Sequence, residues 1–427
     1  MPESVDRLFV HCRELLPLTE GPPTGSRRGE SMQRLDVVED GAIAVRDGRI
    51  VATGTTQDIQ GRYESRDVVD LSDYVVMPGF VDCHTHPVFA STREGEFHMR
   101  CAGADYMAIA QAGGGILRSV RSVHEATDEH LRQMVRKHYD GFLAHGTTTI
   151  EAKSGYGLTT ETEVKSLDAL GAVACEHPLT VSRTFLGAHE VPPDFRDRRD
   201  AYVDLVIEEM MPAVKGKCTS CDVFAEPKVF DRKQSERILR AAIDHGMRLR
   251  IHADEIEPMG GAELAVELGA DSADHLPRIS LAGQDALASS ATTAVLLPGT
   301  SFYLGKQAHA PARSMIEKGC AVALATDFNP GSCYTQSIPL IITLACVLLH
   351  MSVEECVHAV TINPAASLHL DEEIGTLHVG KRADFVALDL PSHRALGYAF
   401  GGNPVVMTVK DGEPVVTNVT ERGYDTE

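Results

Sequence analysis

The stretch Met77–His86, with the sequence MPGFVDCHTH, decides how the rest of the chain is interpreted. An apolar run passes through a Pro-Gly turn and ends in Asp-Cys-His-Thr-His. Side chains two apart on a β-strand point to the same face, so His84 and His86 project together, as a pair that binds one metal ion must. Two ordinary strand histidines would give the same short pattern, because 19 histidines in 427 residues produce about one such pair by chance. The other ligands of a metal site must therefore be sought elsewhere in the chain.

Composition and charge limit the classes of protein to which the chain can belong. Its 427 residues suffice for a large and a small domain, and 43% hydrophobic with 24% charged residues are usual for a globular protein. A formal net charge of −21 without a long Lys/Arg cluster argues against nucleic acid and membrane surfaces as partners. The ten cysteines are scattered, no apolar run is long enough to span a bilayer, and the first residues lack signal-peptide features. We therefore expect a cytoplasmic protein with reduced thiols.

Eight short apolar runs alternate with longer amphipathic segments between about residues 75 and 370. The runs expected to form strands are Gly79–Cys83, Thr147–Ala152, Thr180–Leu186, Asp222–Ala225, Arg248–His252, Ser272–His275, Thr293–Leu296 and Ala321–Thr326. Eight strands with interleaved helices predict the α/β class and a (β/α)8 TIM-like barrel. The alternative is an open doubly wound sheet. That fold usually has a Gly-rich phosphate-binding turn after its first strand, where this chain has His-Thr-His.

Both ends of the chain contain short apolar runs separated by turns. Residues 1–74 include the hairpin signal Asp47-Gly48, and residues 371–427 include a similar turn at Asp411-Gly412. Neither end is expected to bury its own faces alone. We therefore predict that the two ends pair into a small β-sandwich domain beside a barrel domain of residues 75–370. The segment Gly21–Gly29, rich in Pro, Gly and charge, is expected to form an exposed loop.

The expected strands repeatedly end in His, Asp or Glu, which core packing does not explain. In a (β/α)8 barrel the chemistry lies at the C-terminal ends of the strands, so these side chains should meet there. Three histidines and a carboxylate form a ligand set for one divalent ion, which lowers the pKa of a bound water and polarises a carbonyl oxygen. The best candidates are His84, His86, His252 and Asp327. The alternative role of Asp327 is to cap the following segment.

Two further residues have side chains suited to acid–base chemistry at such a site. Glu255, three residues beyond His252, is suited to act as general base, and a surface ion pair is its alternative role. His275 is suited to hydrogen-bond the water or to stabilise a developing oxyanion. An equally good interpretation is that His275 orients Asp327.

Four motifs together resemble the amidohydrolase superfamily. They are PGFVDCHTH (78–86), IHADE (251–255), ATDFNPG (325–331) and GKRADFVALD (380–389). The resemblance implies a metal-dependent hydrolase built on a (β/α)8 barrel. Where the two-metal members of the superfamily carry a bridging lysine, this chain presents Glu226, which implies a single ion.

Longer stretches are similar to those superfamily members that hydrolyse 4-imidazolone-5-propanoate to N-formimino-L-glutamate in histidine degradation. These stretches lie at residues 91–116, 151–158, 184–195, 253–276 and 297–307. The resemblance implies one zinc or iron ion (Zn2+, Fe2+ or Fe3+), a small anionic substrate and a homodimer. It places the metal ligands on His84, His86, His252 and Asp327, and the substrate contacts on Arg93, Tyr156, His189, Glu255, Asn329, Gly331 and Ser332. Arg93 would then bind the propionate carboxylate.

These residues lead to a hypothesis for the reaction. Metal-activated water attacks the cyclic amide with Glu255 as base, while His189, His275 and the ion stabilise the oxyanion. Glu255 or Asp327 then returns the proton to the ring nitrogen. One competing hypothesis is a deaminase of a heterocyclic base, which would use nearly the same metal set without needing Arg93. The non-enzymatic alternative is a metal-free scaffold paralogue, although every expected ligand position is present.

Overall fold

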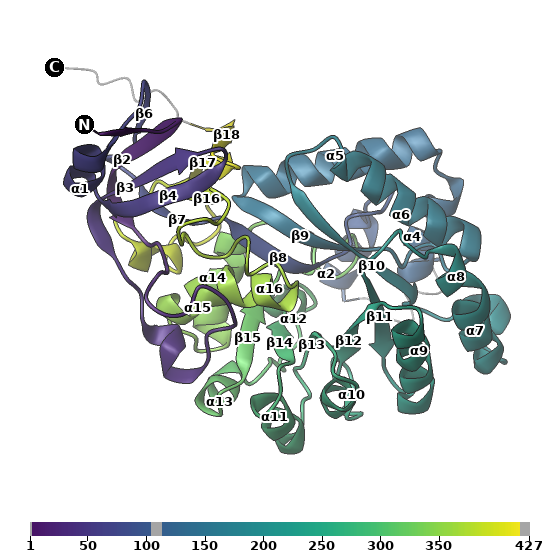
Figure 1. Ribbon diagram of the computed structural model, residues 1–427. Coiled ribbons are helices and arrows are strands. Elements are labelled where there is room, and N and C mark those ends of the chain that lie inside the picture. Colours follow the sequence, from purple (N-terminus) through teal and green to yellow (C-terminus); the bar gives the residue numbers. More distant parts are fainter. Residues whose placement is uncertain (1, 104–112, 419–427) are drawn as a thin grey trace.

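The computed structural model describes residues 2–103 and 113–418, and it consists of a barrel flanked by a second β-sheet (Figure 1). The parallel barrel strands are β8 (Phe80–Thr85), β9 (Thr147–Lys153), β10 (Thr180–Ala188), β11 (Ser220–Ala225), β12 (Arg248–Ala253), β13 (Ser272–His275), β14 (Thr293–Leu296) and β15 (Ala321–Leu324). Each overlaps the range predicted for it, and the predicted (β/α)8 barrel is confirmed. Of the stretch 91–116, residues 104–112 lie outside the described part of the chain.

The barrel closes where its first and last strands end. The strands are hydrogen-bonded in the order β8 to β15, and a parallel bridge joins Thr85 to Phe328 beyond the end of β15. The N–H of His86 donates to the carbonyl of Phe328 at 2.9 Å, and the N–H of Asp327 donates to the carbonyl of His84 at 3.0 Å. These bonds bring Asp327 beside the two histidines of the first barrel strand.

Helices follow the barrel strands and pack around them (Figure 1). They are α2 (Glu94–Cys101), α4 (Ile116–Glu125), α5 (Asp128–Ala144), α6 (Thr160–Ala174), α7 (Arg199–Leu205), η3 (Val206–Met210), α8 (Met211–Ala213), α9 (Arg232–Asp244), α10 (Gly261–Leu268), α11 (Leu281–Ala288), α12 (Pro298–Tyr303), α13 (Ala312–Glu317), α14 (Ile338–Leu348), α15 (Val353–Ala359) and α16 (Ile362–Ser367). Several begin at a side chain that accepts a backbone N–H. Thr127 caps α5 in this way, and Asp231 forms a capping box with Gln234 at α9.

The second sheet combines strands from both ends of the chain, and both termini lie beside it in Figure 1. Its order is β18 (Glu413–Thr417), β17 (Val405–Lys410), β16 (Phe385–Leu388), β7 (Val75–Pro78), β2 (Arg7–Leu15), β3 (Val38–Arg46) and β4 (Arg49–Thr55), with β6 (Asp67–Asp70) paired to β2. The predicted hairpin at Asp47-Gly48 joins β3 and β4, and both turn residues have positive φ angles, 51° and 71°. Phe9 and Phe385 pack edge to face in the core of this sheet, with ring centroids 4.8 Å apart.

The chain passes from the second sheet into the barrel at Gly79. The strand Val75–Pro78, which a boundary at residue 75 assigns to the barrel, pairs instead with β16 and β2. A Cβ at Gly79 would lie 2.4 Å from Oγ1 of Thr148 on β9. Glycine therefore permits the close approach at which β8 starts to pair with β9.

The loop Gly21–Gly29 follows its prediction only in part. Residues 21–23 and Gly25 are exposed as expected, but Arg27 is only 4% exposed. The backbone of Arg27 exchanges hydrogen bonds of 2.7 and 3.0 Å with the side chain of Asn363 on α16. This part of the loop is buried because it docks on the barrel helices.

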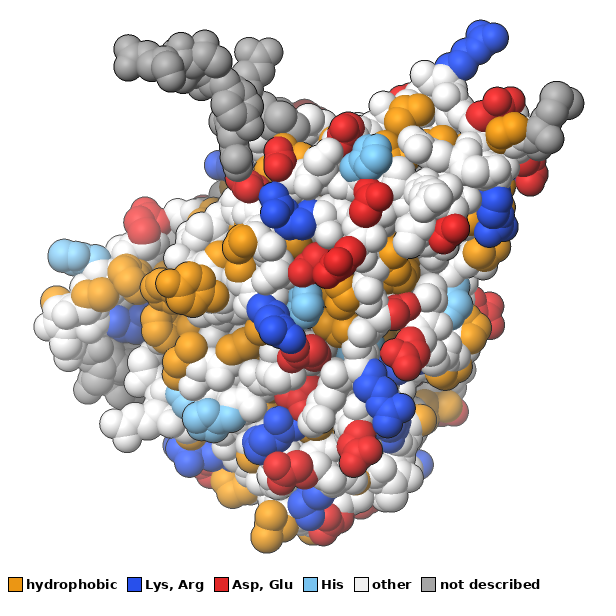
Figure 2. All heavy atoms as spheres, turned by 90° about the vertical axis from the view of Figure 1, so that its left-hand side faces the viewer, with side chains coloured by type: hydrophobic (Ala, Val, Ile, Leu, Met, Phe, Trp, Pro, Cys, Tyr) orange, Lys and Arg blue, Asp and Glu red, His pale blue; other side chains and the backbone are white. Residues whose placement is uncertain are grey.

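The surface agrees with the mixed composition. On the face shown in Figure 2, acidic and basic side chains are interspersed over the second sheet and the neighbouring helices. Within residues 2–103 and 113–418, no helix is both long and apolar enough to cross a bilayer.

Candidate metal centre and active site

The four predicted metal ligands meet at the C-terminal mouth of the barrel. His84 lies in β8, His86 directly follows it, His252 lies in β12 and Asp327 follows β15. All four are almost fully buried, with exposed fractions between 0 and 3%. Oδ1 of Asp327 lies 3.3 Å from Nε2 of His86 and 3.7 Å from Nε2 of His84. The rings of His84 and His252 have centroids 4.5 Å apart.

This arrangement fits a divalent ion. Ligand atoms of His84, His86 and Asp327 lie within 4.8 Å of one another, and so do those of His84, His252 and His275. Among the described residues, the buried Nε2 of His84 has no hydrogen-bond partner. A buried nitrogen without a partner is costly, and coordination of an ion would satisfy it. Three imidazoles and one carboxylate are donors that suit zinc and iron.

Carboxylates on other barrel strands orient two of these histidines, Asp274 from β13 across the barrel and Asp222 from the adjacent strand β11. Nδ1 of His84 lies 2.6 Å from Oδ2 of Asp274, and Nδ1 of His252 lies 3.0 Å from Oδ2 of Asp222. Because an ionised carboxylate only accepts hydrogen bonds, the bond to Asp274 places the proton of His84 on Nδ1 and leaves the lone pair of Nε2 free, while His252 faces Asp222 as an ion pair. The sequence predicts no role for either aspartate. Asp274 precedes His275 at the end of β13, but Asp222 lies in the first half of β11, where no local pattern marks it.

The charges of His84, His86 and Asp327 match a metal site, whereas at His252 the effect of burial is outweighed by the carboxylate of Asp222, which raises the pKa of this ring. Burial lowers the pKa of His84 and His86, so both rings are neutral, as ligands must be. Burial also acts on Asp327 and would raise its pKa, but the nearby rings of His86 and His275 and the hydrogen bond from Thr300 outweigh it. The pKa of Asp327 therefore lies well below its usual range, and the carboxylate is ionised.

Glu255, the predicted base, lies in the loop between β12 and α10. The backbone N–H groups of Glu255 and the next two residues donate to the carboxylate of Glu226 at 2.9, 2.8 and 3.2 Å, which fixes this loop. Nζ of Lys306 donates to Oε1 of Glu255 at 2.8 Å, and Nδ1 of His275 lies 3.8 Å from Oε2. Burial raises the pKa of Glu255, but His275 and Lys306 outweigh it, and the net pKa is lowered. Sequence reasoning missed Lys306.

Tyr156 and His189 lie on the other side of the mouth. Glu163 on α6 accepts hydrogen bonds from backbone N–H groups on both sides of Tyr156, at 3.1 and 2.8 Å, and so holds its loop. The ring of His189 stacks on His86 with centroids 5.1 Å apart. Nδ1 of His189 lies 3.0 Å from the carbonyl oxygen of Gly155, so this nitrogen carries the proton. Burial lowers the pKa of His189, so its ring is neutral and Nε2 offers a lone pair.

Arg93 and the loop 329–332 lie against each other. Nε and Nη2 of Arg93 donate to the carboxylate of Glu96 at 3.0 and 2.7 Å. A Cβ at Gly331 would lie 2.2 Å from Nη1 of Arg93, so the guanidinium packs directly on this glycine. Asn329 donates to Oγ of Ser332 at 2.8 Å and accepts from the N–H groups of Gly331 and Ser332 at 2.9 and 2.7 Å. The polar groups of Asn329 therefore shape the loop.

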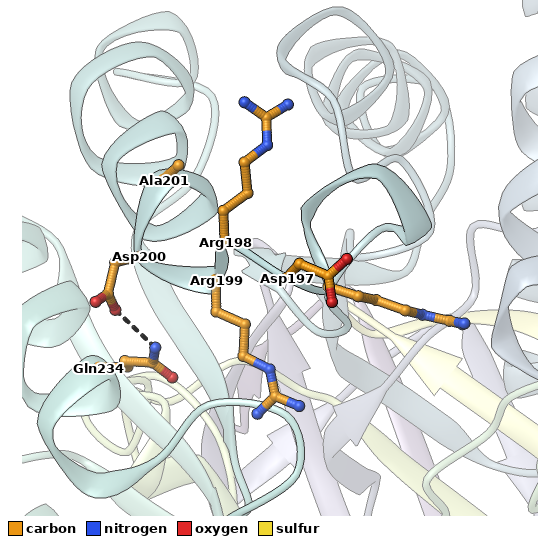
Figure 3. Close-up of a pocket in the computed structure, with 7 residues that line it drawn as sticks. Asp197, Arg198, Arg199, Asp200, Ala201 and Gln234 are labelled. Atoms are coloured by element: carbon orange, nitrogen blue, oxygen red, sulfur yellow. Dashed lines mark hydrogen bonds between the residues drawn. The ribbon is translucent and has the colours of Figure 1, made fainter.

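A surface cavity of about 350 Å³ lies away from this mouth, at the start of α7. Figure 3 shows the side chains of Arg198 and Arg199 pointing in opposite directions, and Asp200 accepts a hydrogen bond of 2.8 Å from Gln234 on α9. The basic groups do not converge, and no predicted site residue lines the cavity. It is separate from the candidate site.

Comparison with known proteins agrees with this geometry. The model of the amidohydrolase family matches residues 75–415, and that of the imidazolonepropionase-like composite domain of bacteria matches residues 41–63. Imidazolonepropionase of Symbiobacterium thermophilum is 47% identical over 96% of this chain and 97% of its own length. Imidazolonepropionase of Parabacteroides distasonis is 47% identical over 91% of this chain and 94% of its own. The chain belongs to the imidazolonepropionase family of amidohydrolases.

The fold is shared more widely than the sequence. The crystal structure of an adenosine deaminase from Xanthomonas campestris with bound zinc has a TM-score of 0.75. The match covers 98% of this chain and 94% of the deaminase chain at 20% sequence identity, so this likeness shows the fold alone. Amidohydrolases are metal-dependent, and this chain has a candidate His/Asp metal site at the barrel mouth.

Proposed function

We propose that this chain is an imidazolonepropionase, which hydrolyses 4-imidazolone-5-propanoate to N-formimino-L-glutamate in histidine degradation. The observation that carries the proposal is the convergence of His84, His86, His252 and Asp327 at one end of the barrel, beside an ionised Glu255. Membership of the imidazolonepropionase family supports the choice of substrate. The buried position of the site suits a small molecule, and the propionate group makes the proposed substrate anionic.

We propose that the four ligands hold one zinc or iron ion. When bound, such an ion lowers the pKa of a water molecule and polarises a carbonyl oxygen. Asp274 and Asp222 hold the Nδ1 sides of His84 and His252, so that both rings present Nε2 to the same point. The donor set is compatible with either metal.

Glu255 moves the proton in the proposed reaction. Its ionised carboxylate accepts a proton from the water that attacks the ring carbonyl carbon. When the ring C–N bond breaks, Glu255 returns this proton to the leaving nitrogen, which regenerates the carboxylate of Glu255. The carbonyl becomes a carboxylic acid, which releases the second proton of the water to solvent and leaves as the carboxylate. Asp327, whose pKa is held lower, is less suited to carry the proton. Lys306 keeps Glu255 ionised and oriented through their 2.8 Å hydrogen bond.

The remaining site residues bind the substrate. We propose that His275, close to both Glu255 and the ligand rings, stabilises the oxyanion that forms on the carbonyl. Because Nε2 of His189 has a free lone pair, His189 is suited to accept a hydrogen bond from the N–H of the substrate ring. His189 could help to stabilise the oxyanion only if its imidazole were protonated. Tyr156 packs against the ring. Arg93 binds the propionate carboxylate, with further contacts from the loop of Asn329, Gly331 and Ser332.

The decisive experiment is incubation of the metal-loaded protein with freshly prepared imidazolonepropanoate. Loss of the substrate's ultraviolet absorbance together with formation of formiminoglutamate is expected, without release of ammonia. Ammonia released from a heterocyclic base, with imidazolonepropanoate left intact, would favour a deaminase. Arg93→Ala should mainly raise KM for imidazolonepropanoate, because only the propionate needs a cation.

We also propose that the protein is a cytoplasmic homodimer. Tyr398 is 87% exposed and Phe400 69%, in the turn that follows η4 (His393–Leu396), and Val347 on the contacting helix α14 is 64% exposed. Apolar side chains of this size are common in subunit interfaces. Light scattering after size exclusion would give twice the chain mass if the proposal is right and the single chain mass if it is wrong.

A further inference from the structure

Lys153 is a buried cation directly beneath the metal ligands. It is the last residue of β9, its side chain is 0% exposed, and it points into the barrel. Nζ lies 2.8 Å from Oε1 of Glu151, 2.7 Å from Oδ2 of Asp222 and 4.0 Å from Oδ2 of Asp274. These three carboxylates are also 0% exposed. A lysine is buried this completely only where carboxylates surround its charge.

Two of these carboxylates are the ones that orient metal ligands. Oδ2 of Asp222 lies 2.7 Å from Lys153 and 3.0 Å from Nδ1 of His252. Oδ2 of Asp274 lies 4.0 Å from Lys153 and 2.6 Å from Nδ1 of His84. One ammonium group therefore contacts the partners of two histidines that come from different strands, β8 and β12.

The same place has the donors of a second cation site. Ligand atoms of His84, Asp222 and Asp274 lie within 4.8 Å of one another, as the ligands of an ion would. Lys153 already supplies a positive charge to both of these aspartates. Arg250, also buried in the barrel, adds positive charge near Asp274 but bonds elsewhere, because its guanidinium donates to the carbonyls of Cys83 and Ser367 and to serine hydroxyls.

We propose that Lys153 is a positioning residue, a built-in cation that holds Asp222 and Asp274 in the geometry in which they present His84 and His252 to a single bound ion. The ammonium supplies these aspartates with the positive charge that an ion bound between them would otherwise supply. The inference rests on the proposed metal site and adds to it the group that holds its two orienting aspartates. Lys153 does not touch the substrate, so its effect is expected on the metal first and on turnover only through the metal.

The test compares Lys153→Met with wild type in metal-free protein titrated with Zn2+. Methionine has a similar length and keeps the interior filled, but it leaves the aspartates without their cation. Loss of a group that orients metal ligands lowers metal affinity by about 10- to 100-fold, and we expect a loss in this range. The matched control is Lys410→Met. Lys410 is 2% exposed and paired with Asp384, but it lies on β17 in the second sheet, so zinc affinity should not change.

A second readout separates positioning from simple destabilisation. The visible absorption bands of Co2+-loaded protein depend on ligand geometry, so they should shift in Lys153→Met and keep their wild-type positions in Lys410→Met. If Lys153→Met does not fold, Lys153→Gln replaces it, because glutamine retains two N–H donors without the charge. Its zinc affinity and Co2+ spectrum are judged in the same way. Wild-type zinc affinity and an unchanged Co2+ spectrum in the folded variant would overturn the inference about Lys153. Failure of wild-type protein itself to bind zinc, iron or cobalt would instead overturn the proposed metal site.

Discussion

Gly331→Ala should weaken substrate binding although it removes no polar group. An added Cβ would lie 2.2 Å from Nη1 and 2.6 Å from Cζ of Arg93, well inside van der Waals contact. The guanidinium can move away from the methyl group only by disturbing its two hydrogen bonds to Glu96, whose side chain is only 7% exposed. The methyl group is therefore expected to turn Arg93 away from the position in which it would bind the propionate.

The size of the effect follows from the bond that is lost. A hydrogen bond to a charged group contributes about 1.5–3 kcal/mol, which corresponds to about a 10- to 150-fold rise in KM. The substrate and the transition state carry the same propionate, so kcat should stay close to wild type. Initial rates over a range of imidazolonepropanoate concentrations, followed by ultraviolet absorbance, measure both constants. Gly402→Ala is the control, because its Cβ would meet no atom within 4 Å.

A double-mutant cycle tests whether the effect passes through Arg93. Arg93→Ala should raise KM by a similar factor, and the double variant should be no worse than Arg93→Ala alone, since the same contact is lost only once. A wild-type KM for Gly331→Ala would refute the steric reasoning. Losses that add in the double variant would show that Gly331 acts on the substrate independently of Arg93.

Three further predictions concern the base and the metal. Glu255→Gln should retain the metal and lose about 10²- to 10⁴-fold in kcat, as removal of a general base does. Its control is Glu257→Gln in the same loop, whose side chain is 50% exposed, and near-wild-type turnover of Glu255→Gln would exclude it as base. Lys306→Met should move the acid limb of the kcat/KM profile to higher pH, because Lys306 lowers the pKa of Glu255 and its loss raises the pH needed to ionise the base. An acid limb at the wild-type pH would show that Lys306 does not influence the pKa of the group that acts as base. Chelation of the metal should lower Tm, and Zn2+ or Fe2+ should restore it, because a ligand bound only by the native state stabilises that state. An unchanged Tm would argue against an ion held by buried ligands.

The barrel could be predicted from the sequence because each strand is a short apolar run closed by a polar residue. The prediction matches β13 and β14 residue for residue, at Ser272–His275 and Thr293–Leu296. The strand Val75–Pro78 could not be assigned in this way. It is as apolar as the barrel strand that follows, and only its pairing with β16, more than 300 residues later, places it in the second sheet.

The proposed metal ligands and the proposed base could be selected from the sequence because they lie at or just beyond the ends of predicted strands. Lys306 could not, because it lies 51 residues from Glu255 in a loop, and no local pattern links the two. Glu151 and Lys153 posed a different problem. Their spacing predicts a shared face of β9, but a strand with Glu, Ala and Lys is usually interpreted as having its polar face in solvent.

The structure places that polar face inside the barrel, where layers of apolar side chains are usual. Buried charges of this kind are costly unless each has a partner, and replacing them by well-packed apolar groups often stabilises a fold. Here each carboxylate has a cationic partner, because Lys153 contacts Glu151 and Asp222 within 2.8 Å and lies 4.0 Å from Asp274. The aspartates also reach His84 and His252, so the buried charges end at two of the proposed metal ligands. An apolar interior would give a more stable barrel with histidines free to turn, and the charged interior gives up that stability to fix them.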